Sequence, residues 1–233
     1  MVIPTGKEIR MEKKEVLVLR DILGTNKKIA AEIRKKLRSK GILSVNLMSS
    51  PGSGKTTLLE SLAGRFRGRF RMAVIEGDIE TEFDAERIRA KGIPTWQITT
   101  GGACHLEAKM VGKVLAEIPA DLDFLFIENV GNLVCPASYD LGESLRFVLL
   151  SSPEGDDKPK KYPEAFLSSH VLVLTKVDLI PHLPFDPSRA RREALETNPS
   201  LEVFEVSALT GQGMGVLEAF LLSALEKLRS GHA

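Results

Sequence analysis

One segment, residues 49–57, limits the possible fold more than any other part of this chain. It reads SSPGSGKTT and stands between an apolar run that predicts a strand, Leu43–Met48, and a helical pattern, Thr56–Phe66. A glycine-rich turn followed by lysine and threonine at a strand-to-helix junction is typical of a P-loop, which holds phosphate with backbone N–H groups and the helix N-terminus. The segment therefore predicts a nucleotide phosphate site at the carboxyl end of a strand.

Each residue type in this loop has an expected task. The glycines allow the backbone to fold around the phosphates, Lys55 reaches the β- and γ-phosphates, and the Thr56 hydroxyl ligates Mg²⁺. The general pattern G-x-x-x-x-G-K-S/T has glycine where this chain has Ser49. The predicted nucleotide-binding residues of the loop are Gly52, Ser53, Gly54, Lys55, Thr56 and Thr57, with Lys55 and Thr56 also expected to take part in catalysis.

Along the chain, apolar runs rich in β-branched residues alternate with helical patterns, as in a mostly parallel sheet flanked by helices. The expected strands are Leu43–Met48, Met72–Glu76, Thr95–Ile98, Phe124–Glu128, Phe147–Leu150, His170–Thr175 and Leu201–Val206. The expected helices are Thr25–Lys40, Thr56–Phe66, Asp84–Lys91, His105–Glu117, Pro187–Asn198 and Met214–Arg229. The predicted fold class is α/β, with one P-loop NTPase domain over residues 25–233 after an N-terminal extension of residues 1–24.

Composition excludes several classes of protein. Lys and Arg number 32 and Asp and Glu 31, so the net charge of +1 provides no global field for nucleic acid or a membrane surface. Two cysteines are too few for a disulfide scaffold, the N-terminal sequence lacks the apolar core of a signal peptide, and the apolar runs are only strand-sized. We therefore expect a reduced, cytoplasmic protein. The stretch SSPEGDDKPKKYPE, residues 151–164, predicts an exposed loop rather than a helix or strand.

Two acidic residues at predicted strand ends are candidates for the Mg²⁺ site. Asp78 follows the strand that ends in VIEGD, and Glu128 closes the apolar strand FLFIE, with Gly131 three residues further on. Ligands bind just beyond the carboxyl ends of parallel strands, so both carboxylates could reach the metal and the Gly131 amide could contact a γ-phosphate. We expect Asp78 and Glu128 to take part in catalysis and Mg²⁺ binding, although Asp78 could instead be a turn or cap residue.

Two further segments predict guanine as the base. TKVD, residues 175–178, resembles the N-K-x-D guanine motif with Thr175 in place of asparagine. The Asp178 carboxylate can accept hydrogen bonds from N1–H and the exocyclic amine of guanine, which adenine cannot offer, and the Lys176 stem can lie over the ring. Ser207-Ala208 resembles the short element whose backbone N–H meets guanine O6. The combination favours GTP over ATP.

Both cysteines of the chain lie close to these elements. Cys104 is followed by His105 at the expected start of a helix, and Cys135 stands four residues after Gly131. Four residues span at most about 14 Å, so a rearrangement of the γ-phosphate site must also affect the position of Cys135. Thiolates and an imidazole are ligands for Zn²⁺ or Ni²⁺, and a second copy of the chain could complete the site across a twofold axis. From the residues alone, two small buried thiols and a structural histidine are the favoured interpretation.

Five segments together resemble the HypB family, the nickel-incorporation GTPases of nickel–iron hydrogenase maturation. They are SSPGSGKTTLLE (49–60), EGDIETEFDAERI (76–88), GGACHLEA (101–108), ENVGNLVCPASYDLGE (128–143) and LTKVDL (174–179), and the resemblance runs from about Lys27 to the C-terminus. The resemblance implies a dimerising P-loop GTPase that uses GTP, GDP and Mg²⁺. It further implies that Cys104, His105 and Cys135 bind Ni²⁺ or Zn²⁺ at a nucleotide-responsive dimer interface.

The resemblance also implies a role and partners: GTP-dependent dimerisation, release of nickel on hydrolysis, and transfer involving the partner HypA and the hydrogenase large subunit. Because no arginine finger or water-orienting glutamine can be assigned from the sequence, we expect slow intrinsic turnover. Two departures from the family pattern stand out: residues 1–26 contain neither Cys nor His, which argues against nickel storage, and Lys109 stands where some members have a further histidine. The alternatives are a urease-type accessory GTPase and a metal-binding dimerisation module with incidental hydrolysis.

Overall fold

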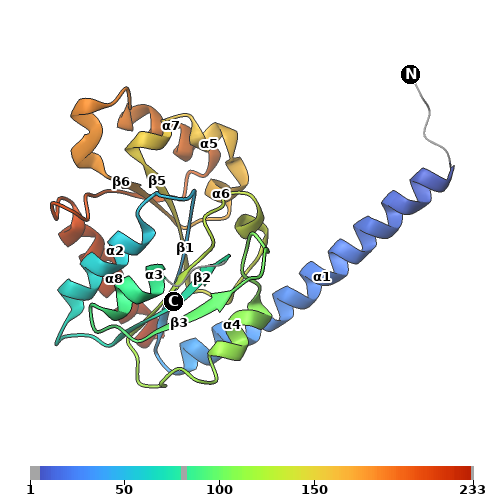
Figure 1. The fold of residues 1–233 in the computed structure, drawn as a ribbon, viewed down its shortest axis with the longest axis horizontal. Helices are drawn as coiled ribbons and strands as arrows, with labels where there is room; N and C mark the ends of the chain where they lie inside the picture. Colours follow the sequence, from blue (N-terminus) through green and yellow to red (C-terminus); the bar gives the residue numbers. More distant parts are fainter. Residues whose placement is uncertain (1–5, 80–82, 232–233) are drawn as a thin grey trace.

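The computed structural model describes residues 6–79 and 83–231, which form a seven-stranded sheet with helices on both faces (Figure 1). The strands are β1 Leu43–Ser49, β2 Met72–Asp78, β3 Thr95–Thr99, β4 Phe124–Glu128, β5 Leu145–Ser151, β6 Val171–Thr175 and β7 Glu202–Glu205. Their order is β3-β2-β4-β1-β5-β6-β7, and every pairing is parallel. The predicted α/β class and P-loop NTPase arrangement are confirmed.

Helices follow most strands, as right-handed parallel connections require. The α-helices are α1 Gly6–Ser39, α2 Lys55–Phe66, α3 Phe83–Arg89, α4 Ala108–Val114, α5 Lys158–Lys161, α6 Pro163–Leu167, α7 Pro187–Thr197 and α8 Met214–Arg229, and the 3₁₀ helices are η1 Cys135–Ser138, η2 Ser152–Glu154 and η3 Val177–His182. Among the described residues, none of these helices combines the length and apolarity that crossing a bilayer would require.

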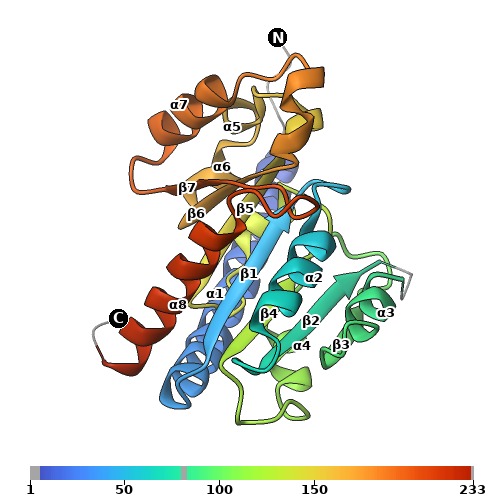
Figure 2. The ribbon, with the colours of Figure 1, turned by 90° about the vertical axis from the view of Figure 1, so that its left-hand side faces the viewer.

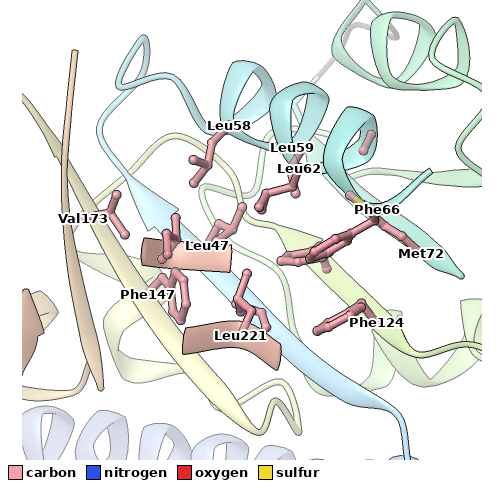
Figure 3. Close-up of a cluster of buried hydrophobic side chains, with 14 of the residues drawn as sticks. Leu47, Leu58, Leu59, Leu62, Phe66, Met72, Phe124, Phe147, Val173 and Leu221 are labelled. Atoms are coloured by element: carbon pink, nitrogen blue, oxygen red, sulfur yellow. The ribbon is translucent and has the colours of Figure 1, made fainter. Parts of the chain in front are cut away.

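The two faces of the sheet are sorted by the alternation of side chains along each strand. On β1, Leu43, Val45 and Leu47 face α2, α3 and α8, where they join the aromatic cluster around Phe66 and Phe124 (Figures 2 and 3). The opposite face of β2 and β4 packs against α1 and α4, and that of β5 and β6 against α6 and α7. The central strand β1 is buried over its whole length, which fixes the P-loop that follows it.

Helix α1 is longer than the sequence pattern predicted. The expected helix started at Thr25, whereas α1 already runs as a helix at Gly6 and extends away from the rest of the molecule (Figure 1). Asn26, expected as a possible cap, lies within the helix instead. Its buried side chain accepts a hydrogen bond from the Ala108 backbone N–H and donates one to the Asp140 carbonyl. Residues 6–24 are rich in Glu, Lys, Leu and Arg, which are strong helix formers and allow the helix to continue. The division into an extension and a domain from residue 25 stays a prediction.

The prediction of an exposed loop over residues 151–164 was wrong. Within it lie η2, α5 and the start of α6, and Ser151, Ser152 and Pro159 are buried. The reason is local capping: the Ser151 backbone N–H and hydroxyl both donate to Glu154, at 2.9 and 2.7 Å, which closes a one-turn capping box. The first turn of a helix accepts proline. A stretch rich in proline and charged residues is therefore as compatible with short helices as with a loop.

Candidate nucleotide and metal sites

The P-loop connects the central strand β1 to α2, as predicted. Gly52 and Gly54 adopt positive φ values of 74° and 91°, the conformation for which glycine is suited, and Gly54 directly precedes the helix. Ser53, Lys55 and Thr56 are buried. The loop therefore presents its backbone and the start of α2 toward the space above the carboxyl ends of the strands, which is the arrangement for holding phosphate.

The structure brings Glu128, at the end of β4, against the start of α2. The Thr56 hydroxyl donates to Glu128 Oε1 at 2.8 Å, and Lys55 Nζ lies 4.0 Å from the same oxygen. Lys55 Nζ also donates to the Ser49 hydroxyl at 3.2 Å, so the serine that replaces a glycine of the general pattern has a partner in this loop. Asp78 ends the neighbouring strand β2 and is partly buried. The predicted catalytic and Mg²⁺ residues thus gather at one edge of the sheet.

Glu76 is a buried acid at this edge that sequence analysis did not single out. In the parallel register of β2 and β4, Glu76 stands directly opposite Glu128, and both side chains lie on the α2 face. Burial, followed by repulsion from Glu128 and Asp78, raises the pKa of Glu76 to about 8. Burial likewise raises the pKa of Glu128 to about 7, against the opposing effects of Lys55 and Thr56. An acid inside an otherwise apolar strand, two residues before Asp78, was the available signal.

The segment after β4 is held beside the P-loop by hydrogen bonds and close packing. The Asn129 backbone N–H donates to the Leu47 carbonyl at 3.0 Å, and Asn132 pairs with Ser49 in an isolated bridge. Gly131 lies so close to the loop that an added Cβ would be 3.0 Å from Pro51 Cα, so only glycine fits there without a shift. Gly131 therefore lies beside the P-loop, and its predicted contact with a γ-phosphate stays a prediction.

A cavity of about 320 Å³ lies beside the P-loop and joins the two predicted base-reading segments. Its lining residues are Gly54, Thr57, Leu58, Thr175, Lys176, Asp178, Leu179, Ser207, Ala208 and Leu209. Asp178 lies in η3 directly after β6, and Ser207-Ala208 follows β7, so two neighbouring strand ends place them together. The sequence prediction that these segments meet is consistent with this geometry.

The TKVD segment also holds the P-loop. The Thr175 hydroxyl donates to the Ser53 carbonyl at 2.7 Å, and Lys176 Nζ donates to the Gly52 carbonyl at 2.7 Å. Lys176 has a φ of 58°, and it is the one non-glycine residue with positive φ within residues 6–79 and 83–231. Such conformations cost free energy and concentrate at functional sites, which agrees with a binding role for this segment.

Cys104, His105 and Cys135 come together, although two of them do not lie where the sequence pattern placed them. Cys104 and His105 were expected to open a helix, but α4 begins only at Ala108, so both lie in the preceding loop. One ligand atom from each of the three residues lies within 4.8 Å of the others. Cys104 Sγ is 3.7 Å from His105 Nδ1, and Cys135 begins η1. All three side chains are partly exposed, so an ion could reach them.

Tyr139, which sequence analysis also missed, supports the imidazole of this cluster. Its ring stacks on His105 with the ring centroids 3.9 Å apart. Burial lowers the pKa of His105, which favours the neutral imidazole that binds metal. The Cys135 pKa is raised, first by the hydrogen bond with Cys104 and then by burial. Lys109 forms an ion pair with Glu107, with Nζ 2.9 Å from Oε2.

Comparison with known proteins agrees with this arrangement. Residues 43–205 match the family described as CobW/HypB/UreG, nucleotide-binding domain. The chain is 51% identical over 197 residues to the hydrogenase maturation factor HypB of Azotobacter vinelandii, with 84% of this chain and 65% of that protein covered, so the chain spans about two thirds of that relative's length. It is 44% identical to the hydrogenase/urease maturation factor HypB of Helicobacter hepaticus, over 91% of this chain and 88% of that one.

Among solved structures, the crystal structure of HypB from Helicobacter pylori in complex with nickel is similar, with a TM-score of 0.80 and 43% sequence identity. The match covers 89% of this chain and 97% of that one. Sequence, fold and the grouping of the P-loop with a thiol–imidazole cluster thus agree, and the chain belongs to the HypB family of maturation factors within the CobW/HypB/UreG nucleotide-binding domains.

Proposed function

We propose that this protein is a GTP-hydrolysing metallochaperone that binds Ni²⁺ or Zn²⁺ and delivers nickel during nickel–iron hydrogenase maturation. The observation that carries the proposal is the cluster of Cys104, His105 and Cys135, whose ligand atoms lie within 4.8 Å of one another, with Cys135 four residues after Gly131, which packs against the P-loop. Cys135 is seven residues from Glu128, which bonds to Thr56 of the P-loop. A change at the phosphates can therefore reach a metal ligand over a short path.

GTP is the nucleotide that the base cavity favours. Asp178 would accept two hydrogen bonds from the guanine edge, the Lys176 stem would cover the ring, and the Ser207-Ala208 backbone would meet O6. The P-loop residues Gly52 to Thr57, with the Gly131 amide, would hold the phosphates.

The acids at the strand ends fit a Mg²⁺ ion, which prefers oxygen ligands. Glu128 Oε2 and Glu76 Oε2 are buried and have no hydrogen-bond partner among the described residues, and the Thr56 hydroxyl donates to the other carboxylate oxygen of Glu128. Thr56, Asp78 and Glu128 would hold the ion, which would neutralise charge on the phosphates. Lys55 would stabilise the charge that builds up as water attacks the γ-phosphorus and the bond to GDP breaks.

Hydrolysis is proposed to be slow without a partner. Arg87 of α3 approaches the loop, with Nη2 3.5 Å from the Thr57 hydroxyl, but it is paired with Glu60 and Asp84 at 3.0 Å each. Its charge is thus already compensated, and it does not act as an arginine finger in this arrangement.

The metal is cargo, and its site would be completed by dimerisation. Two thiolates and one imidazole leave a tetrahedral ion one ligand short, so a second chain that closes over the nucleotides can provide the missing ligand. Loss of the γ-phosphate would relax the segment at Gly131, shift Cys135 and release nickel toward HypA and the hydrogenase large subunit in the cytoplasm. Supply of nickel to urease is a second candidate, because the Helicobacter hepaticus relative carries both maturation roles in its name.

The test is calorimetric titration of Ni²⁺ into protein loaded with GDP or with a non-hydrolysable GTP analogue. We expect the dissociation constant to differ by about fivefold or more between the two states, the lower end of common allosteric couplings. Cys135→Ser should weaken Ni²⁺ binding in both states while leaving nucleotide affinity unchanged. Equal Ni²⁺ affinity in the two nucleotide states of the natural protein would contradict the proposal.

A further inference from the structure

Asn129, directly after β4, is buried where three segments meet. Its side chain accepts hydrogen bonds from the backbone N–H of Leu106 at 3.3 Å and of Val130 at 3.0 Å, and donates to Asn46 Oδ1 at 3.4 Å. Only 1% of the residue is exposed. One amide therefore joins the segment that lies on the P-loop to the loop of the metal cluster and to the central strand.

Leu106 is the contact point on the metal side. It follows His105 in sequence and is fully buried. Its side chain lies against Gly77, where an added Cβ would be 2.8 Å from three Leu106 carbons. Leu106 thus touches the ends of both strands that carry the predicted Mg²⁺ ligands: β2 through its side chain, and the residue after β4 through its backbone N–H.

The other side of Asn129 leads to the second half of the metal cluster. Asn46 Nδ2 donates to Glu143 Oε1 at 3.3 Å, and Arg146 Nε donates to the same oxygen at 2.6 Å. Arg146 then donates to the Ala137 and Tyr139 carbonyls, both at 3.0 Å. Asn46, Glu143 and Arg146 are buried, so the bonds run through the interior.

The two hydrogen-bonded paths from Asn129, one through Leu106 and one through Asn46, end on the two segments that carry the metal cluster. Leu106 adjoins His105, whereas Ala137 lies in η1 with Cys135, and the Tyr139 ring stacks on His105. A buried polar group left without a partner costs more free energy than the bond itself contributes. When the segment after β4 moves, these bonds favour movement of both metal loops with it.

We infer that Asn129 is a positioning residue that transmits the nucleotide state to the metal cluster through Leu106 and Asn46. This role rests on the proposed nucleotide-controlled metal binding. This route differs from the one along the chain from Gly131 to Cys135 because it acts on Cys104 and His105, which are 25 and 24 residues from Asn129 in sequence. Asn129 touches neither nucleotide nor metal in this role.

The test compares a coupling ratio: the Ni²⁺ dissociation constant of GDP-loaded protein divided by that of protein loaded with a GTP analogue. Asn129→Ala should bring this ratio at least about threefold closer to one, while each nucleotide still binds. Asn198→Ala is the matched control. Asn198 is also a buried asparagine, with bonds to the carbonyls of Phe166, Leu167 and Ser169 at 2.9–3.3 Å, and its replacement should leave the ratio unchanged.

The outcomes separate this inference from the proposed function. A wild-type ratio of one overturns both, whereas a wild-type ratio that persists in Asn129→Ala overturns the role of Asn129 alone. An equal loss of coupling in Asn198→Ala would also overturn it, because any buried asparagine would then suffice. Should Asn129→Ala fail to fold, hydrogen exchange at the Leu106 amide of the natural protein decides: protection that changes with the nucleotide supports the inference, and equal protection overturns it.

Discussion

At the scale of single residues, Asp178 gives the sharpest test of base selection. A carboxylate at this position accepts from guanine N1–H and the exocyclic amine, whereas an amide can donate to the O2 of xanthine. Asp178→Asn should therefore weaken GTP binding by about 10-fold to 100-fold, the cost of losing charge-assisted hydrogen bonds, and improve binding of xanthosine triphosphate. Competition binding with both nucleotides measures the change. Asp121→Asn, remote from the cavity and paired with Arg71, is the control, and unchanged GTP preference in Asp178→Asn would refute the assignment.

Glu76 predicts a pH dependence of stability in the protein freed of nucleotide and divalent metal. Burial and the neighbouring Glu128 raise its folded pKa from 4.5 to about 8. A raised folded pKa favours the protonated form, so the contribution of Glu76 to stability is fully present below pH 4.5 and is lost as the pH rises through 8. Glu76→Gln, which cannot ionise, should be more stable than wild type at pH 8.5 by about 1–3 kcal/mol.

Urea denaturation at pH 5 and pH 8.5 in the presence of a chelator measures this difference. The stability gained by Glu76→Gln should be much smaller at pH 5, where Glu76 of the folded protein is already protonated. Glu202→Gln, at an exposed position of β7, is the matched control and should show no such trend. A gain of the same size at both pH values would show that Glu76 does not titrate between them.

At the scale of elements, the sequence predicted strands better than short helices. Strand β4 has the expected bounds, and the other strands differ by one or two residues at either end, because long apolar runs at parallel-sheet positions have few alternatives. Residues 151–164 were misjudged because the local capping by Glu154 is combined with a tertiary contact of the same side chain. Glu154 both caps η2 and accepts from the Ser53 hydroxyl at 2.6 Å, about a hundred residues away in sequence. No local pattern contains that bond.

The same distinction applies to the candidate sites. The P-loop, TKVD and the two acids could be singled out from the sequence because each stands at the end of a recognisable strand. Glu76, Tyr139 and Asn129 were missed because their roles arise from strand register, ring stacking and burial. Glu76 meets Glu128 only through the pairing of β2 with β4, which the sequence does not specify. The position of Cys104 and His105 was misjudged because their loop contains no strong helix stop, and α4 begins three residues later than expected.

At the scale of the whole molecule, the surface beside the nucleotide site predicts where two chains meet. Phe83 at the start of α3 is 71% exposed, and Ile79, directly after Asp78, is 39% exposed. Exposed large apolar side chains beside a ligand site are typical of surfaces that become buried in a complex. If two chains close over their nucleotides, these side chains would be shielded from water. Their burial would then favour the dimer only in the nucleotide state that orders this edge of the sheet.

Phe83→Ala should therefore weaken dimerisation in the presence of a GTP analogue and Mg²⁺. Burial of a phenylalanine contributes about 1.5–3 kcal/mol, so the dimer dissociation constant should rise by about 10-fold or more. Sedimentation velocity over a concentration series measures this constant. Leu167→Ala, at a similarly exposed position of α6, is the control, and both variants should remain monomeric with GDP. An analogue-induced dimer of wild-type strength in Phe83→Ala would place the interface elsewhere, because the most exposed aromatic side chain beside the site would then remain in water.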